Sequence, residues 1–318
     1  MGGEGMNGEK LSARQLSVAV LVGGLSTAAA VAGGADWRWM LGAAVLAVAM
    51  GWLLLRRIEN RPLHPALRAV YCAWSVVLMA EVLRRTAERV QQTAGGREGI
   101  GWVLVLLALP LLWMGWGKAA AFFRTVEIFW LAVLVMTAAI VLLALPRLDW
   151  PYALKPVGDW RGSLSAAAEV FSAGLFALPH LYKMKDAPGA RRGLSWLATL
   201  GAVAAALCLV TAGLLSPAVA GRLDGPFFAA AGLLGDSARL EGLISALWLL
   251  PDLTLAGLMS RAWGEKRWPA LGVLLALGVS LTGLTGGWPE AVLAGGSLAL
   301  AVLTLLVPPE KGKIVVQE

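Results

Sequence analysis

Ten stretches of this chain are apolar and long enough to cross a lipid bilayer, and most of them are joined by short connections. A membrane-spanning helix needs about 20 predominantly apolar residues. The ten stretches are residues 16–33, 39–55, 66–83, 100–116, 119–145, 163–182, 194–215, 237–260, 268–284 and 289–307. They are continuously apolar, which favours helices over the alternating strands of about 10 residues that build a membrane barrel. The sequence therefore predicts an all-α polytopic membrane protein.

The composition supports this class and argues against several others. Hydrophobic residues make up 58% of the chain and charged residues only 15%, whereas soluble domains contain about 25% charged residues. The net charge of +7 lies mostly in connections, where orientation and anionic lipid explain it, so we expect no nucleic-acid partner. The sequence contains no motif for nucleotide binding, metal binding or a nucleophile. We therefore expect neither an enzyme nor a cofactor.

The distribution of basic residues predicts the orientation, because Lys and Arg are retained on the cytoplasmic side. With the N-terminus inside, seventeen of the 27 basic residues are cytoplasmic and ten are outside. Both termini are therefore predicted to be cytoplasmic. The exception is the cluster of Arg84, Arg85, Arg89 and Arg97, which follows the third apolar stretch on the outside. We interpret this cluster as an exposed amphipathic extension of the third helix.

Longer polar connections divide the chain into parts. The predicted parts are a cytoplasmic tail over 1–11, a first five-helix repeat over 12–146, an external connection over 147–162, a second five-helix repeat over 163–307 and a cytoplasmic tail over 308–318. Within the second repeat, a short apolar run near 226–236 is flanked by Gly and Asp. It predicts a short helix on the membrane surface.

Five helices followed by five more are typical of transporters with inverted repeats, in which interrupted helices line a site at the middle of the membrane. The first stretch carries two glycines and two hydroxyls, and the sixth carries a similar group with a carboxylate. Glycine weakens a helix, and hydroxyls supply hydrogen-bonding groups, although glycine is also common where membrane helices pack closely. We predict that helices 1 and 6 are both interrupted and that their loose peptide groups form a pocket.

The predicted pocket brings residues of the two interruptions together. They are Gly23, Gly24, Ser26 and Thr27 from the first helix, and Glu169, Ser172 and Gly174 from the sixth. Backbone N–H groups would bind the carboxylate of a zwitterion, and Glu169 would bind its ammonium group. An ionisable group inside a bilayer is costly unless it is paired or hydrated. A solvated structural role for Glu169 remains an equal alternative, because it lies about two turns from the end of its helix.

The third and eighth stretches offer four further candidates, namely Tyr71, Trp74, Trp248 and Asp252. Aromatic residues in membrane helices usually serve packing. Asp252 differs because it follows Pro251 inside an apolar stretch, where a carboxylate is costly and the proline leaves a backbone carbonyl without its usual partner. Asp252 is predicted to bind a cation, relay a proton or pair with a basic residue such as Arg124.

Short segments spread over nearly the whole chain also carry a family resemblance. They are residues 11–16 (LSARQL), 123–127 (FRTVE), 148–149 (LD), 154–157 (LKPV), 226–228 (PFF) and 239–248 (RLEGLISALW). In these segments the chain resembles the spore germination permeases, the membrane-embedded B subunits of nutrient germinant receptors, within the amino acid-polyamine-organocation superfamily. None of the segments is a catalytic signature.

The resemblance implies a ten-helix protein of the spore inner membrane. Such a protein binds a small nutrient, commonly an amino acid, and works with an A-type and a C-type receptor subunit. Two other functions fit the same fold: an ion-coupled amino acid permease, and a structural membrane subunit that binds no ligand.

Overall fold

The computed structural model describes residues 11–59, 63–94, 99–156, 160–181, 194–223, 225–235, 238–264, 267–284 and 290–307. Its longer helices are α1 (Ala13–Val31), α2 (Trp37–Glu59), α3 (Pro65–Ala94), α4 (Ile100–Trp116), α5 (Ala119–Ala144), α7 (Trp160–Leu181), α8 (Ser195–Leu215), α11 (Ala238–Leu247), α12 (Leu249–Ser260), α13 (Trp268–Thr282) and α14 (Glu290–Leu306). Short helices connect them: η1 (Leu145–Arg147), α6 (Trp150–Leu154), α9 (Pro217–Ala220), α10 (Pro226–Gly232) and η4 (Arg261–Trp263). The two predicted tails lie almost entirely outside the described residues.

The helices agree with the ten apolar stretches. Among the described residues, seven helical spans are long and apolar enough to cross a membrane, and one of them joins α11, α12 and η4. Shorter apolar helices, α4, α13 and most of α14, occupy the other three predicted positions. The prediction of an all-α polytopic membrane protein is confirmed at this level.

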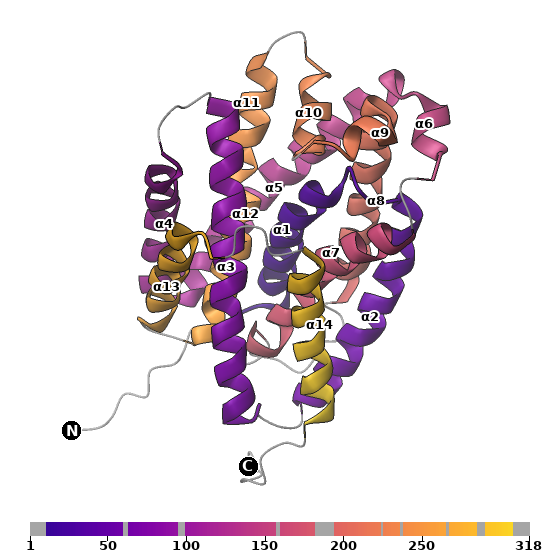
Figure 1. Cartoon of the computed structure of the whole chain (residues 1–318). Coiled ribbons are helices and arrows are strands. Elements are labelled where there is room, and N and C mark those ends of the chain that lie inside the picture. Colours follow the sequence, from indigo (N-terminus) through magenta and orange to yellow (C-terminus); the bar gives the residue numbers. More distant parts are fainter. Residues whose placement is uncertain are drawn as a thin grey trace, which may run out of the picture.

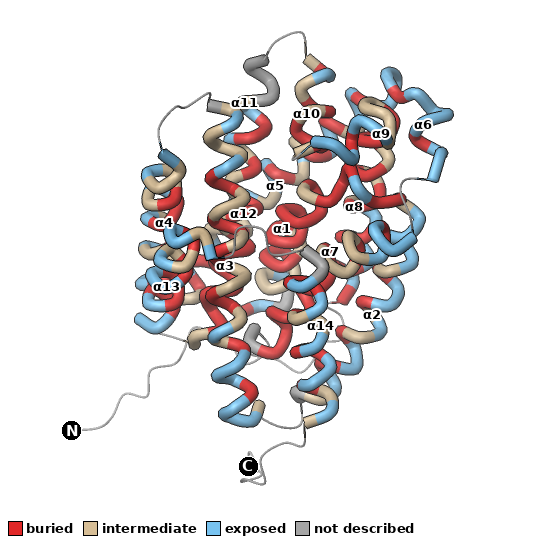
Figure 2. Tube along the Cα trace, viewed as in Figure 1, coloured by how far each residue is buried: buried red, intermediate tan, exposed pale blue. Residues whose placement is uncertain are grey.

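Helix α1 lies at the centre of the bundle and packs against α12, α8, α7 and α5 (Figure 1). Helices α4 and α13 pack against each other on one flank, and α2 packs against α8 on the other. The buried residues gather around α1 (Figure 2). Helices α4 and α5 expose large apolar side chains such as Trp113, Ile128 and Leu142. An apolar exterior around a packed interior is what a bilayer requires, because lipid tails are as apolar as leucine side chains.

Helix α1 begins at a capping box, in which the Ser12 side chain accepts a hydrogen bond from the Gln15 backbone and the Gln15 side chain accepts one from the Ser12 backbone. From there α1 continues to Val31 without a break, and α7 likewise runs continuously from Trp160 to Leu181. The prediction that helices 1 and 6 are interrupted is therefore wrong. The two helices also pack against each other, so the pocket of loose peptide groups does not form.

The glycines of α1 and α7 serve close packing. A Cβ atom on Gly23 would lie 3.3 Å from the Leu255 backbone of α12, and one on Gly24 would lie 2.5 Å from the Leu200 side chain of α8. A Cβ on Gly174 would lie 2.9 Å from the Trp196 ring. Small residues allow membrane helices to approach closely, and the packing gained offsets the low helix propensity of glycine.

The hydroxyls near these glycines satisfy backbone carbonyls in their own helices. Thr27 Oγ1 donates to the Gly24 carbonyl at 2.9 Å, and Ser172 Oγ donates to the Glu169 carbonyl at 3.0 Å. Such local bonds are common for Ser and Thr inside helices. The same residue types that predicted an interruption therefore accompany continuous helices here.

The eighth apolar stretch has a local irregularity of one residue, which we call the helix break and at which the backbone keeps helical angles (φ −70°, ψ −11°). Helix α11 ends at Leu247, α12 begins at Leu249, and Trp248 lies between them. Pro251 has no N–H to donate to the Leu247 carbonyl and its ring crowds the preceding turn. The next bond, from Asp252 N to the Trp248 carbonyl, is long at 3.4 Å. The helix break at Trp248 therefore lies one turn before Asp252.

The end of α3 and the short helix α10 differ from their predicted surroundings. Helix α3 continues to Ala94, and its last turns include the buried Thr86 and Ala87, with the Arg89 side chain only 12% exposed. The interpretation of this region as an exposed extension is wrong, because Arg85 and Arg89 find carboxylate partners inside the bundle. In α10, Phe227 and Phe228 are buried against the protein.

The contact between α2 and α8 supplies a direct test of the packing. A Cβ on Gly201 would lie 2.3 Å from the Ala44 Cβ, where neither side chain can rotate away. We expect Gly201→Ala to lower the stability by about 1–3 kcal/mol through overpacking, measured as thermal unfolding of the purified protein. Gly42→Ala in α2 is the matched control, since nothing lies within 4 Å of its Cβ position. Equal unfolding temperatures for the two variants would contradict the close approach of α2 and α8.

Candidate functional site

Five polar residues from four helices form a continuous network, which we call the charged chain: Glu169, Arg85, Ser26, Asp252 and Arg89. Arg85 contacts the Glu169 carboxylate at 3.1 Å and donates to Ser26 Oγ at 3.2 Å. Ser26 Oγ donates to Asp252 Oδ1 at 2.5 Å, and Arg89 contacts Asp252 Oδ2 at 2.5 Å. The charged chain thus connects α7, α3, α1 and α12.

The members of the charged chain are deeply placed. The exposed fraction is 2% for the Asp252 side chain, 12% for Glu169 and Arg89, and 24% for Arg85. A charge removed from water costs several kcal/mol, and it is tolerated when an opposite charge and hydrogen bonds compensate it. Arg85 pairs with Glu169 and Arg89 pairs with Asp252, so opposite charges compensate each other inside the protein.

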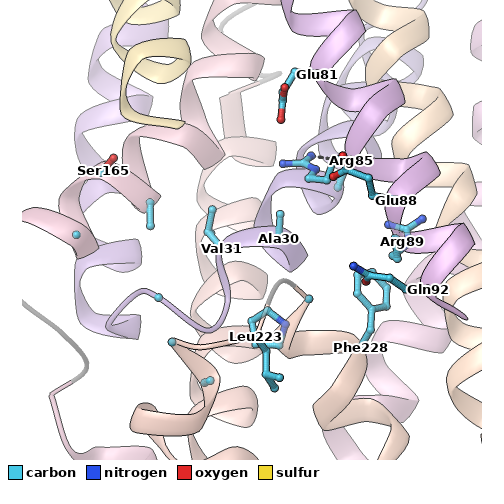
Figure 3. Close-up of a pocket in the computed structure, with 18 residues that line it drawn as sticks. Ala30, Val31, Glu81, Arg85, Glu88, Arg89, Gln92, Ser165, Leu223 and Phe228 are labelled. Atoms are coloured by element: carbon cyan, nitrogen blue, oxygen red, sulfur yellow. Dashed lines mark hydrogen bonds between the residues drawn. The ribbon is translucent and has the colours of Figure 1, made fainter. Parts of the chain in front are cut away.

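A large cavity of about 560 Å³ is lined by three members of the charged chain, Ser26, Arg85 and Arg89. Its walls come from the end of α1, the last turns of α3, the start of α7, and α9 with α10. Figure 3 shows Glu81, Arg85, Glu88 and Arg89 of α3 in the cavity, with Ala30 and Val31 of α1 nearby. Charges of both signs therefore line a volume typical of sites for small molecules, which range from about 300 to 1,000 Å³.

A small cavity of about 40 Å³ lies deeper in the bundle. It shares Glu81 and Arg85 with the large cavity, and it is otherwise lined by residues such as Thr27, Glu169 and Ser172. The pair formed by Arg85 and Glu169 therefore lies on the wall of the small cavity, with Arg85 also facing the large one. These shared residues lie between the two cavities.

An aromatic cluster joins the charged chain to the helix break. The Arg89 guanidinium lies over the Phe228 ring, 4.6 Å from its centroid. Phe228 and Phe227 of α10 both pack against Trp248, with ring centroids 5.9 and 4.8 Å away. Arg89 thus contacts α10 through Phe228 and α12 through Asp252.

The structure brings together several residues of the predicted site. Ser26, Glu169 and Asp252 belong to the charged chain, and Thr27 and Ser172 line the small cavity. They meet through side-chain contacts between continuous helices, whereas the prediction joined them through exposed backbone groups. Asp252 pairs with a basic residue, one of the three predicted alternatives, and this residue is Arg89, whereas the example given was Arg124.

The other predicted residues serve packing. Tyr71 shares a hydrogen bond of 2.7 Å with Thr304, and Trp74 donates to Ser297 at 3.0 Å, so both hold α3 against α14. Trp248 lies in the aromatic cluster, where it packs against Phe228, and its carbonyl accepts the long hydrogen bond from the Asp252 backbone. Gly23, Gly24 and Gly174 are helix-packing positions, as described above.

Sequence reasoning missed the central role of Arg85 and Arg89. One signal for them was present, because a basic cluster on the outside contradicts the usual charge distribution of membrane proteins. Residues four apart also share one face of a helix, so both arginines can point inward together. Their partners lie 84 and 163 positions away in the sequence, and no local pattern identifies such partners.

Comparison with models of known protein families and with curated proteins finds no match for this chain.

Proposed function

We propose that this protein binds a small zwitterion, such as an amino acid, in the large cavity. The observation that carries the proposal is the set of charged side chains of both signs that line this cavity. A zwitterion needs a positive partner for its carboxylate and a negative partner for its ammonium group. Arg85 and Arg89 supply the first, and Glu81 and Glu88 supply the second, all from neighbouring turns of α3.

The sequence resemblance supports a more specific proposal. We infer that the protein is the membrane subunit of a nutrient germinant receptor in the spore inner membrane, working with an A-type and a C-type subunit. In this role, ligand binding in the cavity changes the conformation of the bundle and the change passes to the partner subunits, which triggers germination. Arg89 connects the cavity to the helix break, because it lines the cavity and also contacts Asp252. This connection supports a role in passing a conformational change to other subunits.

We further propose that all ten apolar helical spans cross the bilayer as two inverted five-helix repeats. A twofold axis in the membrane plane would exchange α1 with α7, α2 with α8, α3 with α11–α12, α4 with α13 and α5 with α14. The packing pairs support this exchange, because α1 with α7, α2 with α8 and α4 with α13 are each in contact. The axis would also exchange the contact between α1 and α8 with the contact between α2 and α7. It would exchange the contact between α1 and α5 with the contact between α7 and α14, and all four contacts are present.

The proposed orientation has both termini in the cytoplasm and the large cavity open to the outside. Arg57 at the end of α2 donates to the Val307 carbonyl after α14 at 2.9 Å, which supports an even number of crossings between them. Arg85 and Arg89 lie within the protein interior, so they no longer count as basic residues of an outside connection. The excess of basic residues in the cytoplasmic connections becomes larger as a result.

An ion-coupled amino acid permease is the second candidate, and the small cavity is the observation that favours it. Transport needs a path beyond the ligand site, and the small cavity continues the large one past Arg85. Binding and uptake of labelled amino acids by proteoliposomes separate the candidates. Binding without uptake supports a receptor subunit, uptake driven by an ion gradient supports a permease, and the lack of both supports a structural subunit.

Glu81 is the proposed ammonium partner, because it lines both cavities. We expect Glu81→Gln to weaken the binding of an amino acid by about tenfold or more, as expected for the loss of a charge-assisted hydrogen bond. Equilibrium binding of the labelled amino acid to purified protein provides the measurement. Glu127→Gln is the control, because Glu127 pairs with Arg14 and does not line the large cavity. Unchanged affinity in Glu81→Gln would remove Glu81 from the site.

A further inference from the structure

Arg89 occupies an unusual position, because it faces the large cavity and also holds Asp252 beside the helix break. Its guanidinium contacts Asp252 at 2.5 Å and the Phe228 ring at 4.6 Å. Its Nε is buried and has no hydrogen-bond partner among the described residues. Arg89 therefore has donor capacity beyond its contact with Asp252.

The carboxylate of Asp252 is the group that a ligand must compete with. Asp252 accepts one hydrogen bond from Ser26 and contacts Arg89 with its other oxygen. A ligand carboxylate entering the large cavity offers Arg89 the same chemistry from the opposite side, with geometry suited to two parallel N–H···O bonds.

We propose that the carboxylate of a ligand replaces Asp252 as the partner of Arg89. The loss of this ion pair loosens the backbone at the helix break between α11 and α12. The proposal rests on the proposed function and names Arg89 as the residue that recognises the carboxylate. Three observations support the coupling to the break. Asp252 follows the break by four residues, the Asp252 N–H bond across it is already long at 3.4 Å, and Phe228 connects Arg89 to Trp248.

Competition makes a distinctive prediction about the two partners of the ion pair. Arg89→Gln removes the group that binds the carboxylate, so ligand affinity falls. Asp252→Asn removes the competitor, so ligand affinity rises. A merely structural ion pair predicts the same direction for both variants, because either change disturbs the same packing.

The experiment measures binding to the full-length protein in lipid nanodiscs. The probe is the radiolabelled form of whichever proteinogenic L-amino acid most raises the unfolding temperature of the wild type. Its binding is compared with that of the amine that lacks its carboxylate.

We expect Arg89→Gln to weaken binding of the amino acid about tenfold or more and Asp252→Asn to strengthen it by a similar factor. The double variant should behave like Arg89→Gln, and the amine should bind the wild type and Arg89→Gln equally. Arg147→Gln is the control, because Arg147 is exposed and contacts the Leu233 carbonyl away from the cavity.

Hydrogen exchange supplies a second readout that does not depend on affinity. We expect the amino acid to accelerate exchange over residues 244–254 and not over 268–282, and Asp252→Asn to show faster exchange over 244–254 without ligand. Arg89→Lys keeps the positive charge if Arg89→Gln does not fold, and it should also weaken binding because a lysine cannot bind a carboxylate with two parallel bonds.

The outcomes separate the two levels of the proposal. Weaker binding in both single variants, or slower exchange over 244–254 with ligand, overturns the competition while leaving amino acid binding in place. If none of the amino acids binds the wild type, both the competition and the proposed function fail.

Discussion

Replacing Asp252 with Leu is expected to lower the free energy of unfolding by about 3–5 kcal/mol, the cost of leaving one member of a buried ion pair without its partner. Asp252 is 2% exposed and Arg89 is 12% exposed, so water does not replace the lost carboxylate effectively. Ser26 also loses its acceptor at Asp252. The measurement is unfolding of the purified protein by a denaturing detergent, followed by circular dichroism.

The double variant Arg89→Met with Asp252→Leu tests the reason for this loss. A buried ion pair can often be replaced by apolar residues of similar volume with little change in stability. We therefore expect the double variant to regain most of the stability that Asp252→Leu loses. If the double variant is less stable than Asp252→Leu alone, the loss arises from packing around Asp252 and not from the unpaired arginine.

Replacing Trp248 with Ala is expected to cost about 3–5 kcal/mol, as is typical when a large buried aromatic residue is truncated. Trp248 is fully buried at the break between α11 and α12, and it packs against Phe227 and Phe228. Inside a membrane the loss comes mainly from the contacts removed, since transfer out of water adds little there. The cavity left behind would also free α10 and loosen the contact between Phe228 and Arg89.

Trp113→Ala provides the matched control for this prediction. Trp113 is 81% exposed on α4, and its replacement should change the stability by no more than about 0.5 kcal/mol. Both variants remove one indole, and unfolding by detergent followed by circular dichroism measures the difference in stability. Similar losses in Trp248→Ala and Trp113→Ala would contradict the buried aromatic cluster.

The positions of the long apolar helices could be read from the amino-acid sequence because hydrophobicity is a local property. Each apolar stretch must satisfy its own backbone hydrogen bonds in lipid, and a helix does so without reference to the rest of the chain. The polar residues Ser26, Glu169 and Asp252 were identified for a related reason, since a polar group in an apolar helix is costly wherever it occurs. The sequence therefore determined the class of protein and several residues of the site.

The tertiary structure alone decided how these residues meet. Gly23 and Gly24 have the same local effect on a helix whether they interrupt it or allow a neighbour to approach, and only the positions of Leu255 and Leu200 distinguish the two. Likewise, Arg85 and Arg89 become interior residues only because Glu169 and Asp252 arrive from distant helices. Ion pairing and close packing depend on distances between segments, and such distances arise only when the whole chain has folded.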